Sequence, residues 1–484
     1  MRLIRQIVFH ARLNEAQPAI IFAGGIASYG TMVRAMAAAA EVIDRLDLPK
    51  GTMVMLDVIN PFHHCTLMLT LGLMGISTAS VSSAFSVEHS GVLPSLLLTD
   101  RPNAVLGQVP VIQIDDRWFA ADAAQPVDYA SLLARPGFAD PSEIVRCVYT
   151  SGTTGFPKCV ALSAAVLEAR VLNWMLTTPT QFPGGSGLNM LGFSTVLGII
   201  APLLSLPFGE ALCFANGNVE ALQMIRTFKV EALSLMVGQL QGFLQVLGSA
   251  PPPPSLRIVV VGGSRIAPGM LRAARAKLCS NIAFGYGSTE MGNITGGSGD
   301  SLERAEGSAG YVRPWVEMQV VDANGNEVPR GADGIIRVRS PEMAAYAGDS
   351  PDPVETIRDG WFYPGDVGQL HADGLVVIVS RTTEIINRGG VVVAPEFIEE
   401  VLRRDPQVRD VAVVGVPVNG IEEIWAGVVS DNAVDAPAMG ARAYASLNEK
   451  TPNRILRIDA VPRNENGKVK RAELRELLVA RVAG

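Results

Sequence analysis

The sequence predicts an α/β protein built from more than one structural unit. Short apolar runs that end in glycine, such as VRCVYTSG from 145, LRIVVVGG from 256 and NIAFGYG from 281, alternate with helix-like segments such as PGMLRAARAKL from 268. From about 309 the pattern changes to short β segments separated by turn signals such as DANGNE and HADG. We therefore expect a large N-terminal domain of α/β subdomains plus a β-rich subdomain.

After Arg381 the pattern predicts a small α+β unit. The segment PEFIEEVLRR is typical of a helix, VRDVAVVGVP of a strand and KRAELRELLVARV of a terminal helix. The unit has roughly 100 residues, a size that suits a separate domain. The predicted division is thus a domain at 1–380 followed by a domain at 381–484.

Composition excludes several classes of protein. The 40 Lys and Arg residues against 47 Asp and Glu give a net charge of −7, and the basic residues are scattered, so a nucleic-acid partner is not expected. The five cysteines include no CxxC pair and are too sparse for a disulfide framework. The N-terminal segment has no apolar core of the kind a secretory signal needs. The expected location is therefore the cytoplasm.

One uncharged stretch, 171–209, has two interpretations. It is apolar enough to suggest a membrane-spanning helix, but four prolines and a GGSG segment interrupt it. We expect no membrane span here and predict a buried helix hairpin that lines an apolar pocket.

The segment YTSGTTGFPK at 149–158 is typical of a phosphate-binding loop. Its glycines let the backbone approach phosphate oxygens, its hydroxyls donate hydrogen bonds, and Lys158 adds positive charge. It follows an apolar strand and precedes a helix-like segment from 162. Pro157 separates the lysine from the last glycine, so the segment is not the common GxxxxGK[ST] loop. A plain surface turn would not require so many hydroxyls and glycines.

This loop resembles the signature of the adenylate-forming superfamily, which includes acyl-CoA synthetases, adenylation domains of peptide synthetases and luciferases. Further matches follow in order along the chain: Gly262-Gly263-Ser264 resembles the adenine-side turn, GYGSTE at 285–290 the GYGxTE motif, WFYPGD at 361–366 the WYxTGD segment, RTTEIINRGG at 381–390 the crossover motif, and PRNENGK at 462–468 the PRxxxGK loop. The chain looks most like a stand-alone, AMP-forming acyl-CoA synthetase.

The resemblance implies a role for each matched residue. Lys468 and Thr289 are expected to be catalytic, while Glu290 is expected to be both catalytic and the magnesium ligand, because Mg²⁺ prefers hard oxygen ligands. Tyr286 offers an aromatic face to adenine, and Asp366 can accept bonds from both ribose hydroxyls. The remaining nucleotide-binding residues expected from the resemblance are Thr150, Ser151, Gly152, Thr153, Thr154, Gly155, Lys158, Gly263 and Arg381.

The implied reaction is ATP-dependent activation of a carboxylic acid to acyl-AMP with release of pyrophosphate. ATP and Mg²⁺ are the expected cofactors, coenzyme A the expected acceptor, and the enzyme class an acid–thiol ligase. Transfer to a separate carrier protein or to an amine is the alternative, and a non-catalytic nucleotide-binding partner is a third. In relatives the small C-terminal domain is mobile and carries the catalytic lysine.

Four features stay outside this pattern. We interpret the adjacent His63, His64 and Cys65 as structural, because no second group of ligands accompanies them. The histidine that relatives often have before the acyl pocket has no counterpart between His89 and His371. Thr383 stands at the hinge position where Asp or Lys is frequent. The glycines that follow Glu290 suggest room for an uncharged acyl or aryl tail, although the acid itself is not specified: Gly292, Gly296 and Gly297.

Overall fold

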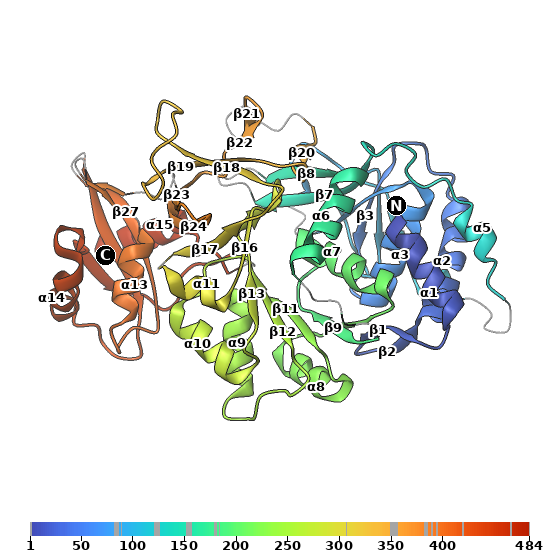
Figure 1. Cartoon of the computed structure of the whole chain (residues 1–484), viewed down its shortest axis with the longest axis horizontal. Coiled ribbons are helices and arrows are strands. Elements are labelled where there is room, and N and C mark those ends of the chain that lie inside the picture. Colours follow the sequence, from blue (N-terminus) through green and yellow to red (C-terminus); the bar gives the residue numbers. More distant parts are fainter. Residues whose placement is uncertain are drawn as a thin grey trace.

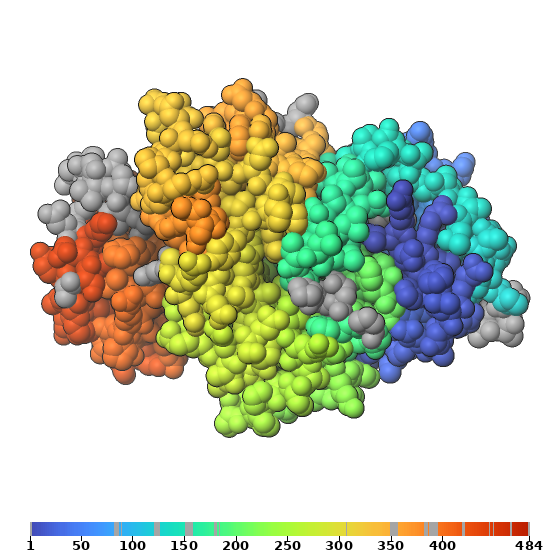
Figure 2. Space-filling view, viewed as in Figure 1, coloured from blue at the N-terminus to red at the C-terminus, as the bar shows by residue number. Residues whose placement is uncertain are grey.

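A computed structural model of the chain describes the following residues: 2–81, 87–88, 90–120, 126–151, 157–178, 182, 184–305, 307–348, 357–381, 386–388, 391–393, 395–418, 421–464 and 467–483. The N-terminal α/β units lie at one end of the molecule, the β-rich part follows, and the C-terminal unit lies at the other end (Figure 1). In the space-filling view the segment around α8 to α10 forms a lobe at the lower edge (Figure 2).

The largest sheet in the described part of the chain joins α/β and β-rich segments. Its strand order is β2-β1-β10-β9-β11-β12-β13-β16-β17-β24-β23-β19-β22-β21, with β18 paired to β19. Strands from β1 through β13 in that order run parallel, and the pairings beyond β13 are antiparallel. The strands are β1 Pro18–Phe22, β2 Gly25–Ser28, β9 Ser186–Asn189, β10 Ala211–Phe214, β11 Ala232–Met236, β12 Ile258–Gly262, β13 Ile282–Phe284, β16 Thr295–Ser298, β17 Ser308–Val312, β18 Glu317–Val321, β19 Gly334–Arg339, β21 Ile357–Arg358, β22 Trp361–Phe362, β23 Asp366–Leu370 and β24 Leu375–Arg381.

A second sheet carries the phosphate-loop segment. Its order is β20-β8-β7-β4-β3-β5-β6, and β20 reaches it from the β-rich part of the chain. The strands are β3 Met53–Asp57, β4 Ser77–Ser80, β5 Leu96–Thr99, β6 Val111–Gln113, β7 Ile144–Ser151, β8 Pro157–Ser163 and β20 Ala345–Tyr346. The helix expected from 162 begins at Ala164, because β8 pairs antiparallel with β7 before the helix starts.

Helices cover these sheets and bury three main cores. Clusters of buried residues lie between α1, α2, α3, α6 and α7, between α8, α9, α10 and the parallel strands, and within the β-rich part. The described helices of the first 380 residues include α1 Arg2–Leu13, α2 Tyr29–Asp44, α3 Pro61–Met74, α5 Tyr129–Leu133, α6 Ala164–Thr177, α7 Val196–Ser205, α8 Asn218–Phe228, α9 Val237–Leu247, α10 Pro268–Lys277 and α11 Gly299–Arg304. A short two-stranded sheet pairs β14 Gly287–Ser288, which is part of the GYGSTE segment, with β15 Gly292–Asn293. Mixed α/β architecture is therefore confirmed.

The uncharged stretch 171–209 is not a helix hairpin. It contains the end of α6, then strand β9, then α7 and a short 3₁₀ helix, Leu206–Phe208. The prediction was wrong because apolarity alone does not distinguish a buried strand from a buried helix. Within the described residues, every helix is too short or too polar to cross a bilayer.

The C-terminal unit packs helices on both faces of the sheet β27-β28-β29. Val411 and Val413 of β27 face α13 and α14, whereas Ala412 and Val414 face α15, as the two-residue period of a strand requires. Both clusters contain only residues from Ile386 onward, which agrees with the division at 380/381; that division stays a prediction. The elements are β25 Ile386–Arg388, β26 Val391–Val393, α13 Pro395–Arg403, β27 Asp410–Val418, β28 Ile421–Val429, α14 Ala436–Leu447, β29 Arg454–Arg457 and α15 Arg471–Ala483.

The histidines of α3 belong to the core. His64 is 3% exposed, its Nδ1 lies 3.1 Å from the Val58 carbonyl oxygen, and its Nε2 lies 2.8 Å from Ser80 Oγ. Its ring stacks on Phe193 with centroids 4.0 Å apart. Burial, followed by the charge of Arg146, lowers the pKa of His64 to about 3. Among the described residues no cluster of three His, Cys, Asp or Glu side chains could hold a metal ion. The burial of His64 and its two polar contacts support the structural interpretation.

We expect His64 to make the protein less stable as the pH falls below about 6.5, the usual pKa of an unfolded histidine. Between pH 6.5 and the folded pKa of about 3, the unfolded chain binds one more proton than the folded chain. The stability that neutral His64 contributes is therefore fully present above about pH 6.5 and is lost as the pH falls from 6.5 towards 3. The free energy of unfolding should fall by up to about 1.4 kcal/mol per pH unit. Thermal unfolding of His64→Gln should show a shallower pH dependence than that of the wild-type protein, and the same slope in the two proteins would contradict the assignment.

Candidate active site

Three of the predicted residues meet at the hairpin β23–β24. The register of this hairpin places Asp366 opposite Arg381, and Arg381 Nε donates to Asp366 Oδ1 at 3.0 Å. The Tyr286 hydroxyl donates to the other oxygen, Oδ2. Asp366 is only 2% exposed, and burial, with the Asp366 charge second, raises the pKa of Tyr286 well above its usual value. The phenol thus stays protonated and orients the carboxylate.

The phosphate-loop segment connects the paired strands β7 and β8. Thr150 lies opposite Lys158 in the register, and the Thr150 hydroxyl donates to the Lys158 carbonyl oxygen at 3.5 Å. Ser151 ends β7. The loop residues themselves lie outside the described part of the chain, as does the Ser151 side chain: Gly152, Thr153, Thr154 and Gly155.

Tyr346 connects Lys158 with Glu290, and sequence analysis did not identify it. Its hydroxyl donates to Glu290 Oε1 at 2.9 Å, and Lys158 Nζ lies 5.3 Å from the centroid of its ring. The position follows from β20, in which Tyr346 pairs with Val160 of β8. A tyrosine in the segment AAYAG carries no motif of its own, so only the pairing of distant strands identifies it.

Gly263 lies just beyond the carboxyl end of β12, next to the end of β11. Its φ of +91° and the adjacent Met236 sulfur leave no room for a side chain, which explains the glycine. Ligands of parallel sheets bind at such carboxyl ends. No described contact links Gly263 to the other predicted residues.

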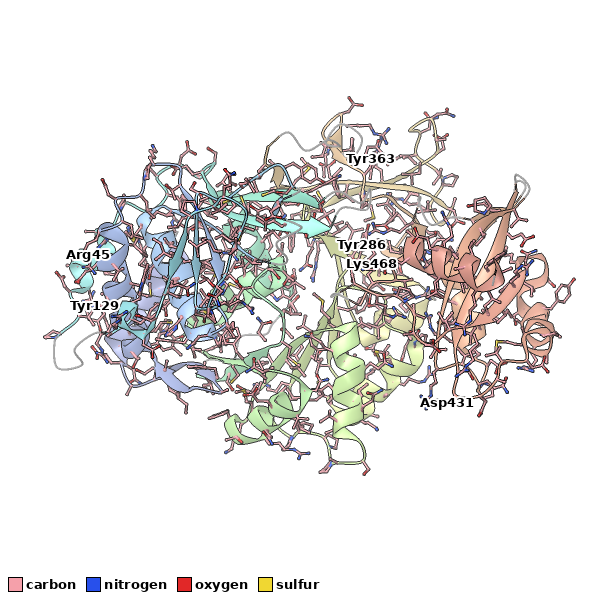
Figure 3. All side chains as sticks on the ribbon, turned by 180° about the vertical axis from the view of Figure 1, so that it is seen from behind. Arg45, Tyr129, Tyr286, Tyr363, Asp431 and Lys468 are labelled. Carbon is pink, nitrogen blue, oxygen red and sulfur yellow. The ribbon has the colours of Figure 1, made fainter. Side chains whose placement is uncertain are left out.

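Lys468 lies in a tight hairpin of the C-terminal unit. Arg463 pairs with Val469, Gly467 takes a φ of +77°, and the Lys468 amide donates to Asn464 Oδ1 at 2.9 Å. Arg463 holds this hairpin to β27 through Asp410, at 2.9 and 3.0 Å. Seen from behind, Lys468 and Tyr286 lie close together in projection (Figure 3). The predicted catalytic role of Lys468 stays a prediction.

The glycines after Glu290 do not leave open space. A side chain at Gly292 would meet Glu342 and Arg170, one at Gly296 would meet the guanidinium of Arg313, and one at Gly297 would meet Ser301. The sequence suggested room for an uncharged tail, but the structure fills two of the three positions with charged groups. Arg313 donates to Thr178 Oγ1 at 3.2 Å.

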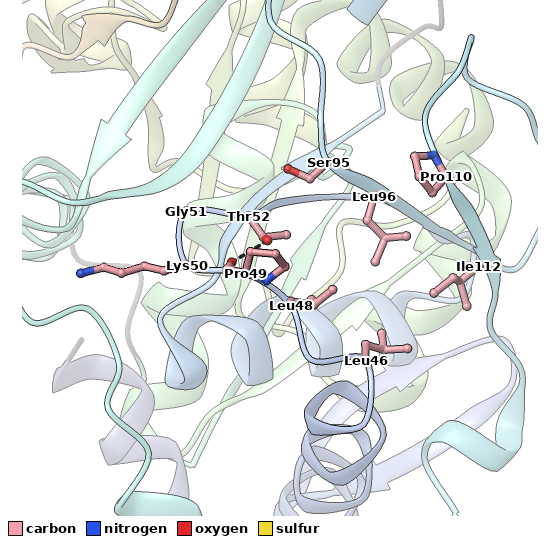
Figure 4. Close-up of a pocket in the computed structure, with 10 residues that line it drawn as sticks. All are labelled: Leu46, Leu48, Pro49, Lys50, Gly51, Thr52, Ser95, Leu96, Pro110 and Ile112. Carbon is pink, nitrogen blue, oxygen red and sulfur yellow. Dashed lines mark hydrogen bonds between the residues drawn. The ribbon is translucent and has the colours of Figure 1, made fainter.

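A surface cavity of about 460 Å³ lies away from these residues (Figure 4). It is formed by the segment after α2 and by the starts of β3, β5 and β6. None of the predicted site residues contributes to it. Its lining is Leu46, Leu48, Pro49, Lys50, Gly51, Thr52, Ser95, Leu96, Pro110 and Ile112.

Comparison with known proteins identifies the family. The family model described as AMP-binding enzyme matches residues 9–346. An indoleacetate–CoA ligase of Aromatoleum aromaticum is 30% identical, covering 79% of this chain and 80% of that protein. The fatty acid–acyl-carrier-protein ligase ScoC of Streptomyces coeruleorubidus is 28% identical, covering 98% of this chain and 96% of that protein.

Solved structures show the same fold. The o-succinylbenzoate CoA synthetase of Bacillus subtilis, in complex with its acyl-adenylate intermediate, has a TM-score of 0.85 at 22% identity, covering 97% of this chain and 98% of that one. The amide bond synthetase McbA of Marinactinospora thermotolerans has a TM-score of 0.84 at 23% identity, covering 99% of both chains.

The chain belongs to the family of AMP-binding enzymes. Within that family it is an adenylate-forming ligase that activates a small-molecule carboxylic acid. The o-succinylbenzoate CoA synthetase of Bacillus subtilis, which shares the fold, has been solved in complex with ATP and a magnesium ion. The resemblance and the fold class expected from the sequence are thereby confirmed.

We expect Asp366→Ala to weaken ATP binding by about 1.5 to 3 kcal/mol, because it removes a carboxylate that can hold two ribose hydroxyls. The Michaelis constant for the acid should change less. Calorimetric titration with ATP measures the effect directly, and Asp373→Ala, which changes an exposed carboxylate in the turn of the same hairpin, serves as the control. Unchanged ATP affinity in a folded Asp366→Ala variant would refute the ribose assignment.

Proposed function

We propose that the protein converts a carboxylic acid to its acyl-AMP, releases pyrophosphate and transfers the acyl group to coenzyme A. The observation that carries the proposal is the direct contact of Asp366 with Tyr286 and Arg381, a preformed ribose-binding corner. Relatives named for coenzyme A ligation, such as the indoleacetate and 2-succinylbenzoate enzymes, support the acceptor.

The proposed roles follow from the chemistry of each side chain. A carboxylate is a poor electrophile, so the acid attacks the α-phosphorus of ATP and pyrophosphate leaves. Lys158 and the loop 150–155 hold the β and γ phosphates, while Thr289 donates a hydroxyl near the α-phosphate. Tyr286 stacks on adenine, and Gly263 lets the backbone approach it.

Magnesium fits the donor set of this region. Mg²⁺ sites commonly use one or two carboxylates together with substrate phosphates, and Glu290 supplies a carboxylate that is oriented by Tyr346. When bound, the ion neutralises charge on the phosphate oxygens. Glu290 is therefore proposed as the protein ligand of magnesium.

The C-terminal unit 381–484 is proposed to rotate about the crossover near Arg381 between the two half-reactions. Thr383, the unusual hinge residue, lies outside the described residues. The cytoplasm is the proposed location, which the thiol state of all five cysteines supports.

A second candidate acceptor is a carrier protein. The ScoC relative, whose name specifies an acyl-carrier-protein acceptor, aligns over nearly the whole of both chains. Transfer to an amine is a third acceptor class, and McbA shares the fold.

Acid-dependent release of pyrophosphate should separate these possibilities. The assay uses a panel from acetate to long-chain and aromatic acids, each run without acceptor and with coenzyme A, a phosphopantetheinylated carrier protein or an amine. We expect at least one acid to support release, and thioester to accumulate only with coenzyme A. Thioester formation on the carrier protein alone would identify that protein, rather than coenzyme A, as the acceptor. Absence of pyrophosphate release with every acid of the panel would refute the proposal.

Lys468→Ala should slow adenylation by roughly 10² to 10³ or more, by analogy with loss of one preorganised donor to the transition state. The lysine is proposed to bridge acid and α-phosphate oxygens while the C-terminal unit is closed. Supplying the variant with synthetic acyl-adenylate and acceptor should restore product formation to near the wild-type rate. An equal loss of rate in adenylation and in acyl transfer, in a folded variant, would contradict the proposal that Lys468 acts only in adenylation.

A further inference from the structure

Arg170 of α6 is buried behind the Thr289-Glu290 segment. The residue is 3% exposed, and its guanidinium donates to three backbone carbonyls: Nη1 to Thr289 at 3.0 Å, Nη2 to Glu290 at 2.8 Å, and Nη2 and Nε to Glu342 at 2.8 and 3.2 Å. The planar fork of arginine is what allows one side chain to reach three carbonyls of two chain segments. Arg170 therefore fixes the backbone of the proposed catalytic residues from behind.

The segment 342–346 contacts both the backbone carbonyl and the side-chain carboxylate of Glu290. Its carbonyl oxygen also accepts from the Ala344 amide at 2.7 Å, and its carboxylate accepts from the Tyr346 hydroxyl at 2.9 Å. Through the Glu342 carbonyl, Arg170 binds the start of this segment as well. The backbone and the carboxylate of Glu290 are thus positioned together.

The environment of Arg170 keeps it charged. Burial lowers its pKa to about 10, which still leaves a cation at neutral pH, and the nearby Glu342 carboxylate favours that charge. Glu342 is itself 2% exposed and accepts from Asn173 Nδ2 at 2.7 Å. Gly292, with a φ of +68°, provides the space, because a side chain there would collide with both charged groups.

We propose that Arg170 is a positioning residue for magnesium-dependent nucleotide binding. It orients the backbone of Thr289 and Glu290 so that the Glu290 carboxylate, steadied by Tyr346, meets the metal–phosphate complex. It touches neither ATP nor the acid. The inference rests on the proposed role of Glu290 as the magnesium ligand and adds the groups that hold that ligand in place.

The test compares ATP binding with and without magnesium. Arg170→Lys retains the charge but not the fork, so calorimetry should show roughly 10-fold or greater weakening of MgATP binding, since small misplacements of a functional group have large effects. Binding of ATP in excess EDTA should change less than about twofold. Arg313→Lys is the matched control, because Arg313 also lies near Glu342 but donates to Thr178.

A second, more conservative substitution tests the proposal if Arg170→Lys does not fold. Tyr346→Phe preserves the ring beneath Lys158 and removes only the hydroxyl that orients Glu290, so it should show the same magnesium-specific loss to a smaller degree. Equal weakening with and without magnesium, or the same loss in Arg313→Lys, would overturn the role of Arg170. If wild-type protein binds ATP equally with and without magnesium, the magnesium assignment of Glu290 fails instead.

Discussion

The short pairing of β20 with β8 determines where several of the proposed nucleotide-binding residues meet. Ala345 pairs with Ala161 and Tyr346 with Val160, so a segment almost 200 residues further along the chain is fixed beside the strand that begins at the phosphate loop. Tyr346 can then contact Lys158 and Glu290 at once. The phosphate loop and the GYGSTE segment belong to separate sheets, and this pairing, together with the contacts of Arg170 to Thr289 and Glu290, connects them.

Charged groups, rather than apolar packing, support the region behind Glu290. Burying Arg170 and Glu342 costs desolvation free energy, and an apolar replacement for such a pair is often no less stable. Apolar side chains, however, cannot donate to the carbonyls of Thr289, Glu290 and Glu342. The contacts indicate that this cluster fixes the geometry of the backbone that it binds.

The sequence identified those residues whose chemistry is concentrated in short motifs. Asp366, Tyr286 and Arg381 were found in this way, and the structure brings them into contact. Arg170 and Tyr346 were missed because their partners lie 119 and 56 residues away, and a contact to a backbone carbonyl leaves no trace in the partner's residue type. The prediction that the glycines at 292 and 296 leave room for an acyl tail was also wrong, because only the fold shows which distant side chains fill the space beside them.

Arg381 links the proposed ribose-binding residues to the proposed domain movement. It is the last residue of β24 and is paired with Asp366, and the crossover to the C-terminal unit begins directly after it. At the other end of that unit, Arg463 ties the Lys468 hairpin to β27, so Lys468 should travel with the C-terminal sheet as one body. If nucleotide holds Arg381 as proposed, a rotation that starts there keeps its pivot fixed while the distant lysine moves, because displacement grows with distance from the axis. In the proposed mechanism, bound nucleotide would therefore steady the pivot in both half-reactions, and Lys468 would remain free to enter or leave the proposed site.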